Sequence, residues 1–327
     1  MKKTLPLFLS FVVFAACSSP VSEPVEEVAE ENVTSSVDLN ANDFAPPTEA
    51  ERGHPTDGPY EQRLLSATST DGVTWEKTNE LIVEQASASD MTYKDGVIYL
   101  YYVGSNFDGR EEGIAAAVSQ DNGNTWTFKR VAINGFEEVK STLGDPDVML
   151  LDDGSTRMYF TAQTPNRKSP SIFYAESADG FNFDYQGEAF YADGYTTIDS
   201  SAFRVNGTWG MLTFSGFGTE VIHAQSKDEG KSFEFVKAED VKYKNQPMFL
   251  SNPLSLPDGS VRFYAFDLRS GFRSFVSTDG LTWTDEGYEI LKLDPSSSME
   301  RDYIKDASIT QLDDGSYFMA YGTRIPE

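Results

Sequence analysis

The chain is poor in cysteine, in histidine and in positive charge, and each shortage excludes a class of protein. Among 327 residues there are one Cys and two His, which excludes a disulfide-stapled scaffold and any Cys-rich zinc site. Acidic residues number 52 against 26 basic ones, so the net charge is −26 and the chain would repel nucleic acid. Hydrophobic residues make up 39% of the chain, enough to build a folded core.

The N-terminus has the features of an export signal. Two lysines precede an apolar run from Leu5 to Ala16, which is too short to span a bilayer because a spanning helix takes about 20 residues. The only cysteine, Cys17, follows this run directly. We therefore interpret residues 1–16 as a signal peptide.

The placement of Cys17 resembles the lipobox of bacterial lipoproteins, although Phe14 stands where Leu is more usual. The resemblance implies that Cys17 becomes a lipidated N-terminus. The protein would then be anchored in the bacterial cell envelope, facing the periplasm or the exterior. An ordinary secretory signal with a chance cysteine is the alternative.

The segment after the signal is acidic and polar. Between Ser18 and Ala50 there are eight acidic residues, four prolines and no Lys or Arg. A segment of low hydropathy and one sign of charge repels itself and builds no core. Residues 17–50 are thus predicted to be a disordered tether, and residues 51–327 the folded domain.

A short motif with the pattern Ser-x-Asp, then Gly, then an aromatic residue occurs five times, at intervals of 49 to 58 residues. In each copy the Asp carboxylate suits a turn cap and the Gly supplies a positive φ. The five acidic positions are Asp71, Asp121, Asp179, Asp228 and Asp279.

Strand-like segments surround every copy, and no strong helix pattern is present. Two strands joined by an Asp-Gly or Asn-Gly turn come before each copy, such as the aromatic-rich segment Val97–Tyr102. Four strands at intervals of about 50 residues are typical of a β-propeller blade. We therefore predict an all-β, five-bladed propeller of four-stranded antiparallel blades. Its last blade should be closed by two N-terminal and two C-terminal strands, which removes the open edges.

The repeated motif resembles the Asp-box of sialidases and other propellers. In those families the box is a structural turn at the edge of the blade. The resemblance implies that the five box Asp residues are structural rather than catalytic.

A ligand site in a propeller is expected where the innermost strands begin. Aligning these strands on their turns places Ala88, Asp145, Asp199, Leu250 and Asp306 at one position. Two residues further along lie Asp90, Asp147, Ser201, Asn252 and Ser308. Because residues i and i+2 share a face of a strand, we expect five Asp side chains to converge near the channel axis. Clustered carboxylates shift one another's pKa, as glycoside hydrolysis requires.

Five blades and the segment Gly144-Asp145-Pro146-Asp147 resemble the arabinanase and β-xylosidase propellers, and more loosely the invertase and levansucrase propellers. The resemblance implies that Asp90 is a general base, that Asp145 or Asp147 adjusts pKa values, and that Asp199 stands where the acid belongs. Two departures are visible. The family's first-blade position holds Ala88, and the third blade lacks the family's Glu, so Glu220 is a substitute candidate.

Sialidases are the second resemblance, on the boxes alone. That family has six blades and three Arg residues that hold the substrate carboxylate. The only Arg-Ile-Pro segment here begins at Arg324, at the end of the chain. Arg301 and Tyr303, which precede the last inner strand, are candidates for further ligand contacts.

The function predicted from these patterns is a glycoside hydrolase of the cell surface, acting on a neutral glycan or oligosaccharide. A non-catalytic glycan-binding or scaffold propeller and a sialidase-like exo-glycosidase are the alternatives. Asp90, Asp145, Asp147 and Asp199 are the catalytic candidates, with Asn252, Asp306, Arg301, Tyr303 and Glu220 for substrate binding. No cofactor is predicted. An acidic channel suits calcium, but no calcium-loop motif is present. We expect a monomer attached to the membrane through Cys17.

Overall fold

The computed structural model describes residues 37–50, 58–105, 112–136, 143–165, 167–215, 220–240, 242–243, 246–268 and 271–326. The predicted signal peptide, Cys17 and the first part of the predicted tether lie outside them. Residues 37–327 form one compact unit. Over the described ranges the structure is almost entirely β, with a three-residue 3-10 turn, η1 (Pro59–Glu61), and no helix long and apolar enough to cross a membrane.

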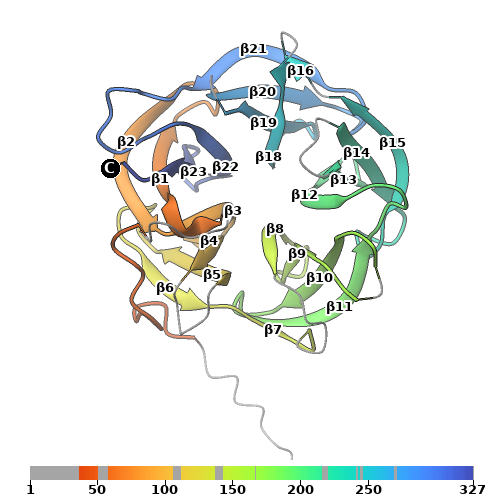
Figure 1. The fold of residues 1–327 in the computed structure, drawn as a ribbon, viewed down its shortest axis with the longest axis horizontal. Coiled ribbons are helices and arrows are strands. Elements are labelled where there is room, and N and C mark those ends of the chain that lie inside the picture. The colour runs from red at the N-terminus through yellow and green to blue at the C-terminus, as the bar shows by residue number, and fades with distance from the viewer. Residues whose placement is uncertain are drawn as a thin grey trace, which may run out of the picture. The chain divides into compact units, whose positions relative to one another are not determined.

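Five blades, each with four antiparallel strands, are arranged in a ring about a central axis, which confirms the predicted five-bladed propeller (Figure 1). The first blade contains β3 (Ala86–Lys94), β4 (Val97–Ser105), β5 (Glu112–Ser119) and β6 (Thr127–Arg130). The second contains β8 (Gly144–Leu150), β9 (Thr156–Ala162), β10 (Ser171–Ser177) and β11 (Asn182–Phe190), with β7 (Ala132–Asn134) parallel to β11. The third contains β12 (Thr197–Val205), β13 (Thr208–Ser215), β14 (Glu220–Ser226) and β15 (Glu234–Asp240). The fourth contains β18 (Phe249–Ser255), β19 (Val261–Asp267), β20 (Gly271–Ser277) and β21 (Thr284–Leu291).

The fifth blade joins the two ends of the chain. Its strand order is β2-β1-β23-β22, built from β1 (Gln62–Ser69), β2 (Trp75–Glu84), β22 (Ile304–Gln311) and β23 (Tyr317–Arg324). β1 pairs with β23 over its whole length. This pairing confirms the predicted closure and leaves the ring without an open seam. A short hairpin of β16 (Lys242–Tyr243) and β17 (Gln246–Pro247) lies between the third and fourth blades in the chain.

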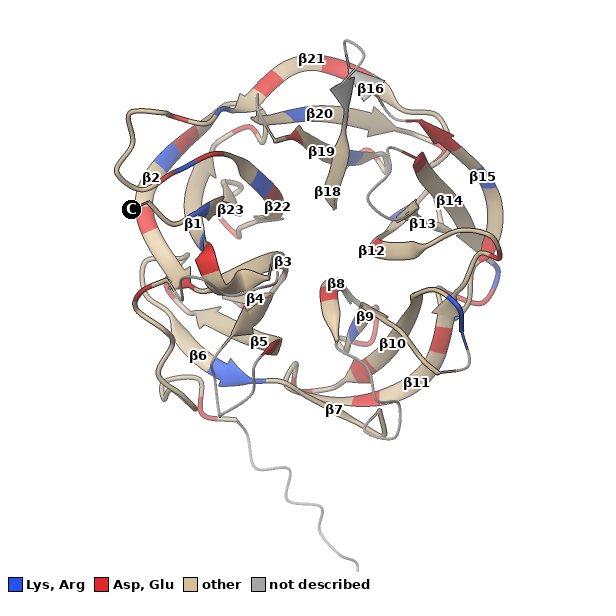
Figure 2. Ribbon diagram, viewed as in Figure 1, with Lys and Arg blue, Asp and Glu red and all other residues tan. Residues whose placement is uncertain are grey.

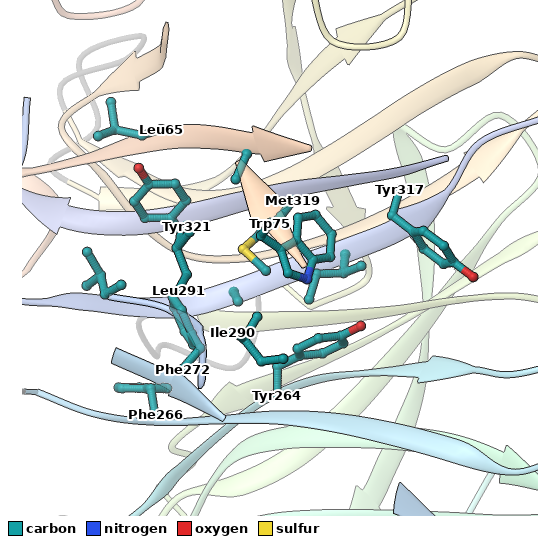
Figure 3. Close-up of a cluster of buried hydrophobic side chains, with 14 of the residues drawn as sticks. Leu65, Trp75, Tyr264, Phe266, Phe272, Ile290, Leu291, Tyr317, Met319 and Tyr321 are labelled. Carbon is teal, nitrogen blue, oxygen red and sulfur yellow. The ribbon is translucent and has the colours of Figure 1, made fainter. Parts of the chain in front are cut away.

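Aromatic side chains fill the spaces between blades. Figure 3 shows one such cluster, where Trp75 of the fifth blade meets Tyr264 of the fourth edge-on, with ring centroids 6.3 Å apart. The Tyr264 hydroxyl also donates a hydrogen bond to the Gly72 carbonyl in the next blade's turn, at 2.8 Å. The same bond recurs from Tyr101 to Gly180 and from Tyr159 to Gly230. Aromatic packing and buried hydroxyl bonds thus join each of these blades to its neighbour.

The five Ser-x-Asp turns share one hydrogen-bond pattern. In every copy the Ser hydroxyl donates to the Asp carboxylate, and the turn Gly donates its N–H to the Ser oxygen. The carboxylate then accepts one or two backbone N–H groups from the end of the turn. These carboxylates therefore hold the turn backbone and point into their own loops.

Residues 37–50 pack against the first blade, within the range predicted to be a free tether. Asp43 donates its N–H to the Phe128 carbonyl at 2.8 Å, and its carboxylate forms an ion pair with Lys129 at 2.6 Å. The Lys129 ammonium also donates to the carbonyls of Asp38 and Ala41. This strap, residues 37–50, covers the outer edge of β6, and the compact unit begins at Val37 rather than at position 51.

Candidate active site

Every inner strand contains a β-bulge close to its start. The pairing registers shift between Ser87 and Asp90 and at the corresponding points of the other four strands. The first bulge residues are Ala88, Asp145, Asp199, Ser251 and Asp306. In the fourth blade this residue is Ser251, so the predicted alignment of Leu250 and Asn252 was wrong by one position.

In four of the five blades the first bulge residue has an uncommon backbone conformation. Asp145, Asp199 and Asp306 have φ values of 52°, 50° and 50°, and Ala88 has 46°. Non-glycine residues in this region are strained, and such strain gathers at functional sites. Figure 2 shows acidic positions at the channel-facing starts of β8 and β12, and adjacent basic and acidic positions on β22. Three blades thus present a carboxylate from the same strained position.

These three carboxylates line a cavity where the inner strands begin, which we call the mouth cavity. Its volume is about 60 Å³, which is enough for about four water molecules at about 15 Å³ each. Asp145, Asp199 and Asp306 are partly exposed there. The buried hydroxyls of Ser89 and Ser200 also line this cavity. The mouth cavity is polar on this side and accepts only a small group or one edge of a larger ligand.

Asp145 and Asp199 are hydrogen-bonded to each other through their carboxyl groups. Burial raises the pKa of both, and the charge of Asp145 raises that of Asp199 further. The side chain of Thr161 also hydrogen-bonds Asp145, and its oxygen accepts the Asp199 N–H at 3.1 Å. Burial and the contact between the two carboxyl groups thus both favour retention of a proton on this pair.

Asp306 has a different partner. Its carboxylate forms an ion pair with the neighbouring Lys305 at 2.9 Å. Burial opposes the charge on Lys305, but Asp306, with further contributions from Tyr303 and Asp199, raises the pKa of Lys305 above its usual value. The Asp306 charge in turn raises the pKa values of Asp145 and Asp199, while the Lys305 charge lowers them. The mouth cavity thus combines two carboxyl groups of raised pKa with a third that is ion-paired with Lys305.

Asp90 and Asp147 lie further along their strands, so the five Asp side chains form two layers instead of one cluster. Both residues are buried, with exposed fractions of 4% and 1%. They line a second cavity of about 290 Å³ formed by the later halves of the inner strands, the far cavity. The bulge separates the layers because it inserts one residue between positions that a regular strand would place on one face.

The deeper carboxylates bind the backbone of the next blade. Asp90 accepts the N–H groups of Val148 at 2.6 Å and of Met91 at 2.7 Å, and Asp147 accepts that of Ala202 at 2.8 Å. Burial raises the pKa of Asp90 to about 6, although these hydrogen bonds oppose the rise. Burial and the nearby Asp90 charge raise the pKa of Asp147 well above its usual value. Asn252 also lines the mouth cavity.

Three of the predicted contact residues lie outside the described lining of both cavities. Glu220 begins β14, the third strand of its blade, and pairs in register with Asp240. Arg301 and Tyr303 bridge each other just before β22, and Arg301 approaches the Asp302 carboxylate at 3.6 Å. Among the described residues, no three His, Cys, Asp or Glu side chains are grouped so that they could hold a metal ion.

Other lining or partner residues were not predicted. Lys305 was missed although it directly precedes Asp306, and Thr161 was missed because it comes from the second strand, β9. The wall of the mouth cavity between the third and fourth blades is aromatic, built from Phe214, Phe249 and Phe266. In the sequence these residues are apolar strand ends, which cannot be distinguished from ordinary core positions. The sequence therefore does not predict that they line a cavity.

The fold is a five-bladed propeller in which acidic residues of three inner strands line one cavity. A model of the glycosyl hydrolases family 32 N-terminal domain matches residues 64–241, more than half of the chain, and the chain belongs to this family. The matched range contains Asp90, Asp145, Asp147 and Asp199, and it ends before Asp306. No curated protein sequence matches the chain.

Solved structures share the fold at low sequence identity. A thermostable family-43 glycoside hydrolase matches with a TM-score of 0.57 and 14% identity over 73% of this chain and 88% of that one. An exo-1,5-α-L-arabinanase from a bovine ruminal metagenomic library gives 0.53 and 14% over the same shares. A protein of unknown function from Dyadobacter fermentans gives 0.53 and 18% over 80% and 84%. At these identities the likeness is one of fold.

Proposed function

We propose that the protein hydrolyses a glycosidic bond at the mouth cavity. The observation that carries the proposal is the trio Asp145, Asp199 and Asp306, three partly exposed carboxyl groups that line one cavity. Two of them have raised pKa values, and the third is ion-paired with Lys305. Glycoside hydrolysis uses one carboxylic acid and one carboxylate. Membership of a glycosyl hydrolase family supports the same reaction class.

In this proposal the Asp145–Asp199 pair is the general acid and Asp306 is the carboxylate. The pair gives its proton to the leaving oxygen of the scissile bond, and Asp306 receives a proton from the attacking water or bonds to the sugar carbon itself. Lys305 lies beside Asp306 and forms an ion pair with it. The proposal moves the base from Asp90 to Asp306, because both Asp90 oxygens accept backbone N–H groups.

A non-catalytic glycan-binding protein is the second candidate, favoured by one observation. The first bulge residue of the first blade is Ala88, so that blade offers no carboxylate at the mouth cavity. A protein that binds glycans without cleaving them would need the polar lining but no acid and base pair.

A screen of aryl glycosides and oligosaccharides decides between the two. The wild-type protein should release product from at least one neutral sugar, and Asp199→Asn and Asp306→Asn should each lower kcat by at least about 100-fold. Asp179→Asn, in a Ser-x-Asp turn, is the matched control and should leave kcat within about two-fold. Binding without turnover, or turnover that survives both channel substitutions, would contradict the hydrolase assignment.

We further propose that Cys17 carries the lipid that holds the protein on the cell envelope. The support is the position of the only cysteine directly after the apolar run. Wild-type protein should incorporate labelled palmitate in a bacterial host and fractionate with membranes. Cys17→Ala should do neither, and a Cys17→Ala protein that stays membrane-bound would refute the anchor.

A further inference from the structure

We propose that the aromatic wall of Phe214, Phe249 and Phe266 is the surface that binds the C–H face of a neutral sugar ring beside the Asp145–Asp199 pair. The inference rests on the proposed function as a glycan-cleaving site. It specifies neutral sugars as the ligand class and names the residues that would select them. Its central residue is Phe249, the first residue of β18.

The wall is a continuous set of rings. Phe249 and Phe266 are stacked with centroids 5.5 Å apart and an interplanar angle of 30°. Phe214 meets Phe249 at 5.6 Å in a tilted arrangement. All three line the same cavity as Asp199, and they come from the third and fourth blades.

Phe249 is the ring that a ligand can reach. Phe214 and Phe266 are buried, with exposed fractions of 3% and 5%, whereas Phe249 is only partly buried. The first bulge residue of this blade is Ser251, where three other blades carry Asp. Ser251 and the three rings line the same cavity, and the Ser251 hydroxyl oxygen accepts the Ala307 N–H at 3.0 Å. The fourth blade thus contributes apolar surface where the second, third and fifth contribute charge.

This division of the lining matches one kind of ligand. A sugar ring has a face of C–H groups, which is attracted to the negative face of an aromatic ring, and an edge of hydroxyl groups, which suits carboxylates. The described lining contains three Asp side chains, and the one cation beside them, Lys305, is already paired with Asp306. A second negative charge on the ligand would be repelled, so neutral sugars are favoured over uronic and sialic acids.

The size of the mouth cavity limits how the sugar enters. At about 60 Å³ the cavity admits a part of one ring. The ring therefore lies against Phe249 with its hydroxyl edge turned toward the carboxyl groups. Phe249 acts by positioning the ring, and the chemistry stays with the acids.

The test compares three substitutions of Phe249 in the full chain. The probes are p-nitrophenyl glycosides of neutral pentoses and hexoses, with p-nitrophenyl β-D-glucuronide as the charged member, followed by turnover and by saturation-transfer NMR for binding. Phe249→Ala and Phe249→Leu should each raise KM, or weaken binding, by at least about ten-fold with kcat within about three-fold. Phe249→Tyr should stay within about three-fold of wild type because it keeps the ring.

The Leu and Tyr variants separate stacking from simple support of the fold. Leu fills space without an aromatic face, so a purely structural residue would tolerate Leu at least as well as Tyr. Phe235→Leu is the matched control, since Phe235 is 47% exposed on β15 and lines neither cavity. It should change nothing.

The possible results distinguish failure of the aromatic wall from failure of the hydrolase assignment. Leu equal to Tyr, glucuronide preferred to its neutral counterparts, or no neutral sugar bound at all would overturn the aromatic wall. Loss of turnover in Asp199→Asn with unchanged Phe249 variants would keep the hydrolase and reject the wall. Neutral-sugar binding that depends on Phe249 without turnover would keep the wall and reject the hydrolase.

Discussion

Aspartate serves opposite purposes at the two ends of this propeller. In the Ser-x-Asp turns the carboxylates accept hydrogen bonds from their own loops, and these bonds lower the pKa of Asp71 and Asp279 to about 2. In the channel, burial and neighbouring carboxyl groups raise the pKa values of Asp145, Asp147 and Asp199. The same side chain thus stabilises the fold as an anion in one region and is held as an acid in the other.

The difference shows what a functional carboxylate requires. A turn supplies N–H donors within a few residues, so the charge is satisfied locally. The inner strands bring carboxyl groups from separate blades together in buried surroundings, so the negative charge is disfavoured and the pKa values rise. Asp43 of the strap belongs with the first group, because Lys129 and the Arg130 N–H satisfy it and lower its pKa although burial opposes this.

The strap gives the largest expected effect on stability. Lys129→Met should destabilise the protein by about 3 kcal/mol, because the nearly buried ammonium neutralises Asp43 and saturates two carbonyls. Urea unfolding measures the loss, and limited proteolysis should now cut within residues 37–50. Lys129→Arg keeps the charge and should lose less. An unchanged midpoint for Lys129→Met would show that the strap adds nothing to the fold.

Turn and channel substitutions should have opposite signs. Asp71→Ala removes bonds to the Val73 and Thr74 N–H groups and should lower stability by about 1–2 kcal/mol. Asp199→Asn removes a carboxyl group whose negative charge is disfavoured by burial and by the charge of Asp145. The substitution should therefore leave the melting temperature at pH 7 unchanged or raise it. Thermal melts of both variants measure this. Equal losses would mean that the channel carboxylate also supports the fold.

The pH dependence of stability should separate the two regions as well. A carboxyl group whose pKa is lower in the folded protein than in the unfolded chain stabilises the fold at pH values above the unfolded pKa. The contribution of Asp71 to the free energy of unfolding should therefore be lost as pH falls from about 3.8 to about 2. A raised pKa does the reverse, so the contribution of Asp90 is present below about 3.8 and is lost as pH rises to about 6. Urea midpoints across pH 2–7 should show that Asp71→Ala flattens the first window and Asp90→Asn the second.

The smallest expected effect is on the pH profile of activity. Lys305→Met removes a positive charge that lowers the pKa values of Asp145 and Asp199, so the basic limb of kcat against pH should move up by about one unit or less. Lys305→Arg should keep the limb in place. A limb that moves down would show that the acid lies elsewhere.

Much of the fold was predictable because its signals are local. The Asp-Gly turns, the aromatic strands and the five Ser-x-Asp copies each depend on a few neighbouring residues, and their period predicts the blade count. The closure of the last blade followed from counting strands at the two ends, and β1 pairs with β23 as expected. The strap was not predictable, because its acidic residues resemble a solvated tether until Lys129 on β6 is placed beside them.

The candidate site was only partly predictable for a geometric reason. Alignment on turns found the strands that carry the acids, but it could not show the bulges that separate Asp90 and Asp147 from Asp145 and Asp199. An inserted residue changes which side chains share a face, and no local pattern reports it. The same bulge placed Ser251 at the mouth position of the fourth blade, where alignment on turns placed Leu250.

By itself the sequence determined the five-bladed ring, its closure and the acidic residues of its inner strands, because repeats, turns and charge depend on residues that are close together in the sequence. The tertiary structure decided which carboxyl groups meet, which bind backbone, and where the aromatic wall faces them. Those relations join residues more than 50 positions apart, such as Asp145 and Asp199, and burial where they meet raises the pKa values of both.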